Sequence, residues 1–127
     1  MLSRMRYRFT ARQRLRRARE FDVVRKFGRP FRSPPFIFSI YIPSGVGEGK
    51  PVRRLGIVAS RRVGKAVDRN RCKRLCRELF RMHQHELPDN CDCVLVVRPK
   101  FTDFTFRELE KRFTQACQYL NQKLTPP

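Results

Sequence analysis

The pattern of residues 66–87 constrains the fold more than any other part of this chain. On a helix that turns about 100° per residue, one side of this segment gathers apolar side chains, at Cys72, Leu75, Cys76, Leu79, Phe80 and Leu87. The opposite side gathers an amide and four cations, at Asn70, Lys73, Arg74, Arg77 and Arg81. The segment therefore predicts a long helix that packs one face against a core and presents a row of positive charge to solvent.

The charge of the whole chain agrees with that basic face. The 127 residues include 30 Lys and Arg against 11 Asp and Glu, so the formal net charge is +19. A surface with this much uncompensated positive charge attracts polyanions such as nucleic acids. With 40% hydrophobic residues the chain can also pack a core, and its length fits one domain over residues 1–127. Residues 1–17 hold arginines and no acid, so we expect a flexible basic arm there.

The apolar runs and the cysteines favour a cytoplasmic protein. No run reaches the roughly 20 apolar residues of a membrane helix, and the N-terminus lacks the apolar stretch of a secretory signal. Five cysteines, an odd number, favour reduced thiols over a disulfide framework. The alternative interpretation of the Arg-rich N-terminus is an organellar transit peptide.

The remaining hydrophobic patterns predict an α+β fold in the order α-β-β-(β)-α-β-α. Helices are expected over residues 18–27, before Gly28, and after the capping-box pair Thr105 and Glu108. Residues 36–42 and 54–60 are predicted as strands, and the Gly- and Pro-rich segment between them predicts that they form a β-hairpin. Residues 92–97 are predicted as a buried strand, and a further short strand is expected near residues 28–33.

The strongest chemical signal is the basic segment 61–77, which has eight Lys or Arg and one acid in seventeen positions. Gly64 lets the backbone turn before the helix, and Asp68 in the first turn complements the helix dipole. The helix N-terminus and its arginines would together offer donors to phosphate oxygens, and the Asn70 amide suits a base edge, a 2′-hydroxyl or a metal-bound water. The alternative is a solvated helix face, which the scarcity of acids in the segment disfavours.

This segment also carries a family resemblance. The run S-R-R-V-G-K-A-V-D-R-N-R-C-K-R-L-C-R-E-L-F at residues 60–80 resembles the signature of the bacterial ribonuclease P protein subunit, with the Arg-Asn-Arg motif of that family at Arg69, Asn70 and Arg71. The resemblance extends over nearly the whole chain, through Arg14-Leu15, Glu20-Phe21, the strand from Phe36, and residues 54–60, 85–88 and 94–98. It implies a small two-layer α/β sandwich with a left-handed βαβ crossover, which general rules of chain topology would not predict.

The resemblance implies an accessory subunit of an endoribonuclease, in which a catalytic RNA and its magnesium ions remove the 5′ leader of precursor tRNA. Its implied partners are that RNA and the precursor tRNA, with no membrane and no obligate protein partner, and no residue of the chain is implied to be catalytic. Nine residues would dock on the catalytic RNA: Arg61, Arg62, Lys65, Arg69, Asn70, Arg71, Lys73, Arg74 and Arg77. A cleft between the first helix and the sheet would hold the single-stranded leader, at Arg14, Phe21, Phe36 and Phe38.

Two positions depart from the pattern of the family. Arg25 stands where many relatives have a second Phe on the first helix, and Ser39 stands where some have a leader-contacting Tyr. The alternative role for Phe36 and Phe38 is core packing, and because strand residues alternate between faces, we expect only one face of that strand to line a cleft.

A metal site held by the protein alone is not expected. Cys91 and Cys93 lie near His83 and His85 in the sequence, but their spacing does not match a zinc site. The resemblance instead places Asn70 near magnesium bound by the RNA.

Three other classes of protein fit the composition. They are a structural RNA-binding protein of ribosomal type, a DNA-compacting protein, and a nucleic-acid enzyme with its own active site. The motif in this element order favours the ribozyme subunit over the first two. The third would need a cluster of metal-binding carboxylates, which the sequence does not show.

Overall fold

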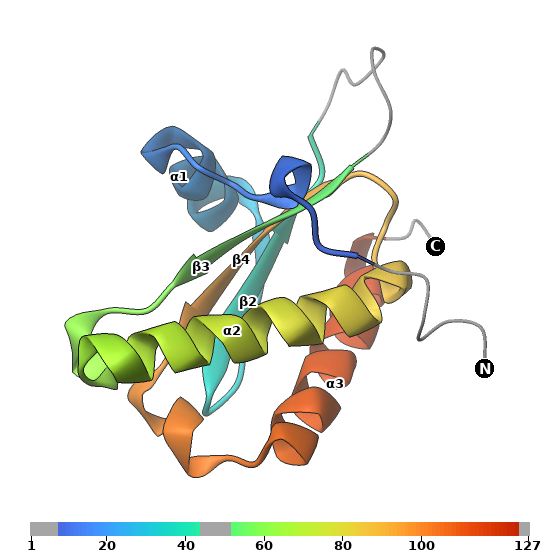
Figure 1. The fold of residues 1–127 in the computed structure, drawn as a ribbon. Coiled ribbons are helices and arrows are strands. Elements are labelled where there is room, and N and C mark those ends of the chain that lie inside the picture. The colour runs from blue at the N-terminus through green and yellow to red at the C-terminus, as the bar shows by residue number, and fades with distance from the viewer. Residues whose placement is uncertain (1–7, 44–51, 125–127) are drawn as a thin grey trace.

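The structure is a computed structural model that describes residues 8–43 and 52–124. Its strands are β1 (Arg29–Arg32), β2 (Phe36–Tyr41), β3 (Arg53–Val58) and β4 (Cys91–Val97). Its helices are α1 (Ala18–Phe27), α2 (Ala66–His83) and α3 (Phe106–Leu124), with 3₁₀ turns η2 (Ala11–Gln13), η3 (Arg61–Val63), η4 (Gln84–Glu86) and η5 (Pro99–Asp103). The predicted α+β class and element order are confirmed, including the short extra strand, which is β1 (Figure 1).

The four strands form one sheet in the order β1-β2-β4-β3. β4 pairs antiparallel with β2 and parallel with β3, and β1 pairs antiparallel with β2. The predicted hairpin between residues 36–42 and 54–60 is therefore wrong, because β4 lies between those two strands. β4 takes the interior position because its side chains are buried on both faces, and the tight hairpin is instead β1–β2, which turns at Ser33 to Pro35.

The connection from β3 through α2 to β4 joins two parallel neighbours. In Figure 1, α2 passes on the viewer's side of the sheet, and β4 lies to the left of β3 when both strands are turned to point upward. The crossover is therefore left-handed, as the family resemblance implies and against the general rule for such units.

Helices pack on both faces of the sheet. The main core lies between the sheet and the helices α2 and α3, and it includes Phe36, Phe38 and Phe113. On the opposite face, α1 packs its buried Val24 near Val94 of β4. Alternation along β2 and β4 separates these two sets of side chains, so the sheet has one face toward α2 and α3 and another toward α1.

The helix boundaries follow local chemistry. α2 buries the cysteines and apolar residues of its predicted core face, at Cys72, Cys76, Leu79 and Phe80. It ends at His83 and not at Leu87, because η4 tightens the last turn before Pro88. The capping box at the start of α3 is confirmed: the Thr105 N–H donates to Glu108 Oε1 at 2.8 Å, and the Glu108 N–H donates to Thr105 Oγ1 at 3.2 Å.

Residues 8–17 do not form the free basic arm that the sequence predicts. Leu15 is buried, and its N–H donates to the Leu55 carbonyl at 3.0 Å. The Gln13 amide donates to Gln84 Oε1 at 2.8 Å and to the Arg53 carbonyl at 3.1 Å. One leucine and one glutamine thus fix this Arg-rich segment along β3, while residues 1–7 of the predicted arm lie outside the described residues.

All five cysteines are free and buried. Burial raises the pKa of the Cys76, Cys93 and Cys117 thiols, so they stay protonated and act as small apolar side chains. Among the described helices, none has the length and hydropathy needed to cross a membrane.

We predict that Phe38→Ala lowers the free energy of unfolding by about 3–5 kcal/mol, because the Phe38 ring is fully buried and packs 4.9 Å from the Phe113 ring centre. Urea unfolding measures this loss. Ile37→Ala, on the other face of the same strand and half-buried, should cost less. Equal losses for the two variants would contradict the assignment of Phe38 to the core.

Candidate RNA-binding surfaces

The basic motif begins at a turn that requires glycine. Gly64 has a φ of +149°, and it is the one residue with positive φ among those the structure describes. A Cβ at this position would lie 2.7 Å from Asp68 Oδ2, which accepts a hydrogen bond from the Lys65 N–H at 3.0 Å. Asp68 therefore caps α2 at the place where the chain turns out of η3. The sequence predicted the turn at Gly64 and an acid in the first turn of the helix, but not this hydrogen bond.

The Arg-Asn-Arg motif divides into one half-buried and two exposed residues. Arg69 folds back and donates from Nη1 to the Gly64 carbonyl at 3.0 Å, so it also fixes the turn. Asn70 and Arg71 are exposed on the first turns of α2. Four other predicted cations of this segment are exposed as well, at Arg61, Arg62, Lys65 and Arg74. We call these exposed residues with Arg69 the α2 docking face.

A groove of about 360 Å³ lies between the N-terminal segment, α1, β3 and α2. It brings together four residues that the sequence predicted on two separate surfaces, Arg14, Phe21, Lys73 and Arg77. The rest of its lining is Phe9, Leu15, Arg16, Leu55, Gly56 and Ile57. The groove therefore combines two aromatic rings and four cations with no acidic side chain, and α2 forms one of its walls.

Phe21 lies directly on the backbone of β3. A Cβ at Gly56 would lie 2.3 Å from Phe21 Cε2, so the ring occupies the space that any other residue would fill. Gly56 thus allows α1 to approach the sheet closely, and it leaves Phe21 half-buried at the wall of the groove.

Phe36 and Phe38 do not belong to this groove. Both rings are fully buried on the face toward α3, 6.3 and 4.9 Å from the Phe113 ring centre. Alternation along β2 sends them to the side of the sheet opposite α1 and Phe21, so the prediction that they line the leader cleft is replaced by the core-packing alternative. No residue of β2 lines the groove, so neither face of this strand takes the cleft role that the sequence analysis expected of one of them.

Sequence reasoning missed Phe9. Its ring packs edge-on against Phe80 at 5.7 Å, and the Arg14 guanidinium lies 5.4 Å from the Phe9 ring centre. Phe9 lines the groove and also an adjoining hollow of about 280 Å³ beside Arg74 and Arg77. The signal in the sequence was an aromatic residue within a run of arginines, a pattern suited to stacking on unpaired bases.

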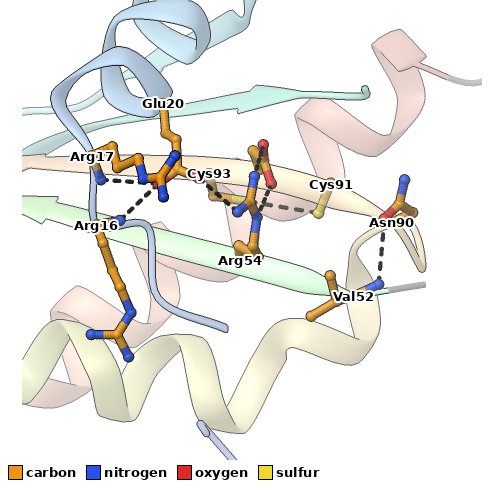
Figure 2. Close-up of polar contacts among 9 residues, drawn as sticks. Arg16, Arg17, Glu20, Val52, Arg54, Asn90, Cys91 and Cys93 are labelled. Atoms are coloured by element: carbon orange, nitrogen blue, oxygen red, sulfur yellow. Dashed lines mark hydrogen bonds and ion pairs between the residues drawn. The ribbon is translucent and has the colours of Figure 1, made fainter. Parts of the chain in front are cut away.

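A chain of charged groups positions α1 over the sheet (Figure 2). Arg54 of β3 donates to both carboxylate oxygens of Asp92, its partner in the β4 register, at 2.8 Å each. The same guanidinium donates to Glu20 Oε2 at 2.9 Å. Glu20 Oε1 accepts from the Arg17 and Arg16 N–H groups at 3.0 and 2.9 Å, so Glu20 caps α1 and ties its first turn to the sheet. Phe21 is the next residue, so this chain of contacts also fixes its place.

The hydrogen bonds to Glu20 make its ionised form much the more stable one. The Arg17 and Arg16 backbone N–H groups, followed by the Arg54 guanidinium, lower the pKa of Glu20 to about 2.

Neither position that departs from the family pattern lies at the groove. Arg25 is exposed on α1, and Ser39 is buried on the α1 side of β2. Neither is among the residues that line the groove.

Comparison with known proteins identifies the family. The sequence model of the ribonuclease P family matches residues 9–121. The chain belongs to the ribonuclease P protein family. The ribonuclease P protein component of a Nitratiruptor species is 37% identical over 111 residues, which cover 87% of this chain and 94% of the relative. That of Thermotoga maritima is 36% identical over 95 residues, which cover 75% of this chain and 77% of the relative.

Solved structures agree with this membership. The RNase P protein from Thermotoga maritima superposes with a TM-score of 0.66 at 27% identity, over 89% of this chain and 98% of that chain. An RNase P protein from Staphylococcus aureus shares the fold, with a TM-score of 0.72 at 23% identity over 84% of this chain and 94% of that chain. As a member of this family, the chain is a subunit of the ribonucleoprotein endoribonuclease that processes tRNA 5′ ends, with RNase P RNA and precursor tRNA as its partners.

We predict that Glu20→Gln lowers the free energy of unfolding at pH 7 by about 1–2 kcal/mol, because a cap and an ion pair are weakened. A carboxylate whose pKa falls on folding stabilises the protein above its ordinary pKa of 4.5, and this stabilisation disappears as the pH falls toward about 2. The difference between wild type and variant, measured by urea unfolding, should therefore shrink between pH 5 and pH 2. A constant difference over this range would contradict the assigned role of Glu20.

Proposed function

We propose that the α2 docking face binds the catalytic RNA and that the groove beside Phe21 holds the 5′ leader of precursor tRNA. The observation that carries this proposal is the lining of the groove, in which Phe9 and Phe21 stand among four cations with no acid. A single-stranded leader offers bases that stack and phosphates that pair with cations, and this lining suits both.

The α2 docking face suits a structured RNA. Its exposed cations are Arg61, Arg62, Lys65, Arg71 and Arg74, and Gly64 and Asp68 fix the turn from which they project. Cations beside the exposed N–H groups of a helix start suit phosphate oxygens, and the backbone that carries them is already ordered before binding. Each phosphate that they neutralise releases counterions, so binding here should weaken steeply with salt.

Lys73 and Arg77 connect the two surfaces. Both extend from α2 into the wall of the groove, and both are half-buried. A leader in the groove would therefore run alongside the helix that holds the catalytic RNA. This arrangement supports a protein that aligns substrate and ribozyme in a single complex.

The chemistry in this proposal belongs to the RNA. Within residues 8–43 and 52–124, no three His, Cys, Asp or Glu side chains come together in a way that could hold a metal ion. We assign the magnesium ions to the catalytic RNA, as the family resemblance implies. The exposed Asn70 amide is placed to hydrogen-bond a base edge or a water of such an ion. We place the holoenzyme in the cytoplasm, since the family relatives are bacterial and the substrate is a precursor tRNA.

We predict that Arg71→Ala weakens binding of the catalytic RNA roughly tenfold and lowers the slope of log affinity against log salt by about 0.7–0.9. Arg71 is exposed, so the fold should be unaffected. Filter binding over a range of salt concentrations measures both values. Arg107→Ala removes one exposed cation from α3 and serves as the control. Equal effects of the two variants would count against the docking face.

We predict that Phe21→Ala reduces the preference of the holoenzyme for leader-bearing over mature tRNA by roughly fivefold or more, because a base loses its stacking partner. Binding of both tRNAs to the assembled holoenzyme measures the ratio. Phe21→Leu keeps an apolar side chain on Gly56 and should show a similar loss. Phe27→Ala, on the same helix and 64% exposed outside the groove, should leave the ratio unchanged. A wild-type ratio for both Phe21 variants would remove Phe21 from the leader site.

A further inference from the structure

A second basic pocket lies at the end of the sheet, away from the leader groove. It has a volume of about 530 Å³ and lies between the β1–β2 turn and the start of η5. Its lining is three cations, two prolines and a serine, at Arg32, Ser33, Pro34, Arg98, Pro99 and Lys100. We call it the strand-end pocket, and no site predicted from the sequence includes any of these residues.

The walls of the strand-end pocket are fixed. The Ser33 N–H donates to the Phe36 carbonyl at 2.9 Å, and the Arg98 N–H donates to the Pro35 carbonyl at 3.0 Å. The Arg98 side chain donates from Nη1 to the Ser33 carbonyl at 3.2 Å, across the pocket wall. Prolines on both segments restrict the backbone further, so the cations project from a frame that need not order on binding.

The positive charge of the pocket is uncompensated. Arg32, Arg98 and Lys100 are all exposed, and no acidic residue belongs to the lining. Within the described part of the chain, none of these three cations forms an ion pair. Arg112 of α3 donates from Nη1 to the buried Ser33 hydroxyl at 3.4 Å and adds a fourth positive charge near the turn. Two guanidinium groups and an ammonium without acids suit a phosphodiester, which accepts paired hydrogen bonds from arginine.

The location of the strand-end pocket favours contact with the catalytic RNA over contact with the leader of precursor tRNA. η5, which carries Lys100, packs against η3, which carries Arg61 and Arg62 of the α2 docking face. The leader groove instead lies along β3, and β1 and β3 are opposite edges of the sheet. Figure 1 shows the end of β4 and the start of α2 on the same side of the molecule as η5.

We propose that the strand-end pocket binds the phosphate backbone of the catalytic RNA, as a second docking point beside η3. This proposal rests on the proposed docking of α2 on the same RNA, and it extends the RNA-binding surface around the end of the sheet. It excludes the leader from this pocket. The pocket would anchor the protein in two directions, along α2 and across the sheet, and so fix its orientation on the RNA.

The test uses the reconstituted holoenzyme and the triple variant R32A/R98A/K100A. We expect its affinity for the catalytic RNA near physiological salt to fall at least tenfold, and the salt slope to fall by about 1–2, as for the loss of one to three phosphate contacts. The control R107A/K111A/K123A removes three exposed cations from α3 and should lose much less. Equal losses in the two triple variants would overturn the proposal.

Because Arg98 also bonds to the Ser33 carbonyl, a second variant keeps it. R32Q/K100Q should also lower the affinity for the catalytic RNA and the salt slope, while its melting temperature stays at the wild-type value. Ethylation of individual phosphates of the catalytic RNA gives a direct readout: some ethylated sites should impair binding of the wild type and not of R32Q/K100Q. If no such site exists, or if only the preference for leader-bearing tRNA changes, the proposal fails. If R32Q/K100Q binds the catalytic RNA more weakly while Arg71→Ala binds it as tightly as the wild type, the α2 docking face is overturned and the strand-end pocket is retained.

Discussion

The parallel pairing of β4 with β3 is the constraint on which the rest of the structure depends. Parallel neighbours need a long connection, and here α2 makes it, so the most basic helix of the chain must lie across one face of the sheet. β4 is buried on both faces, and α1 covers the face that α2 and α3 leave open. Arg54 and Asp92 face each other in this parallel register, and they provide the ionic anchor for Glu20 at the start of α1.

Both RNA surfaces follow from that arrangement. α2 buries Cys72, Cys76, Leu79 and Phe80, and it leaves the cations Arg71 and Arg74 exposed to solvent. The N-terminal segment and α1 pack along β3 beside the same helix, so Phe9 and Phe21 meet Lys73 and Arg77 in one groove. The protein thus offers positive charge and aromatic rings on fixed elements, and it leaves the cleavage chemistry to its RNA partner. Phosphate binding and base stacking need cations and aromatic rings in fixed positions. They do not need a catalytic side chain with a shifted pKa.

The sequence pattern predicted those parts of the fold that depend on interactions between residues near one another in the chain. The amphipathic period of α2, the cap at Thr105, the turn at Gly64 and the extended run from Phe36 all appear in the structure at or near their predicted places. Strand pairing was not predictable in the same way, because adjacency in sequence favoured a β2–β3 hairpin and only the two-sided burial of β4 explains its insertion.

The groove was predicted in part. The motif and Phe21 were identified, whereas Phe36 and Phe38 were placed on the wrong face of the sheet. Alternation along a strand shows that its two faces differ, but it does not show which face packs against α1. Phe9 was missed because two contacts distant in sequence, from Gln13 and Leu15, order its segment.

The measurement that tests this account most directly is cleavage of a leader-bearing precursor tRNA at low magnesium and moderate salt. The reaction is run with a bacterial RNase P RNA alone, with the protein alone, and with both. We expect efficient cleavage at the mature 5′ end only in the combined reaction. Cleavage by the protein alone would reveal an active site of its own and contradict the assignment of the chemistry to the RNA. Binding of the RNA without any change in cleavage would contradict the role of the protein in processing, and would leave a structural RNA-binding protein.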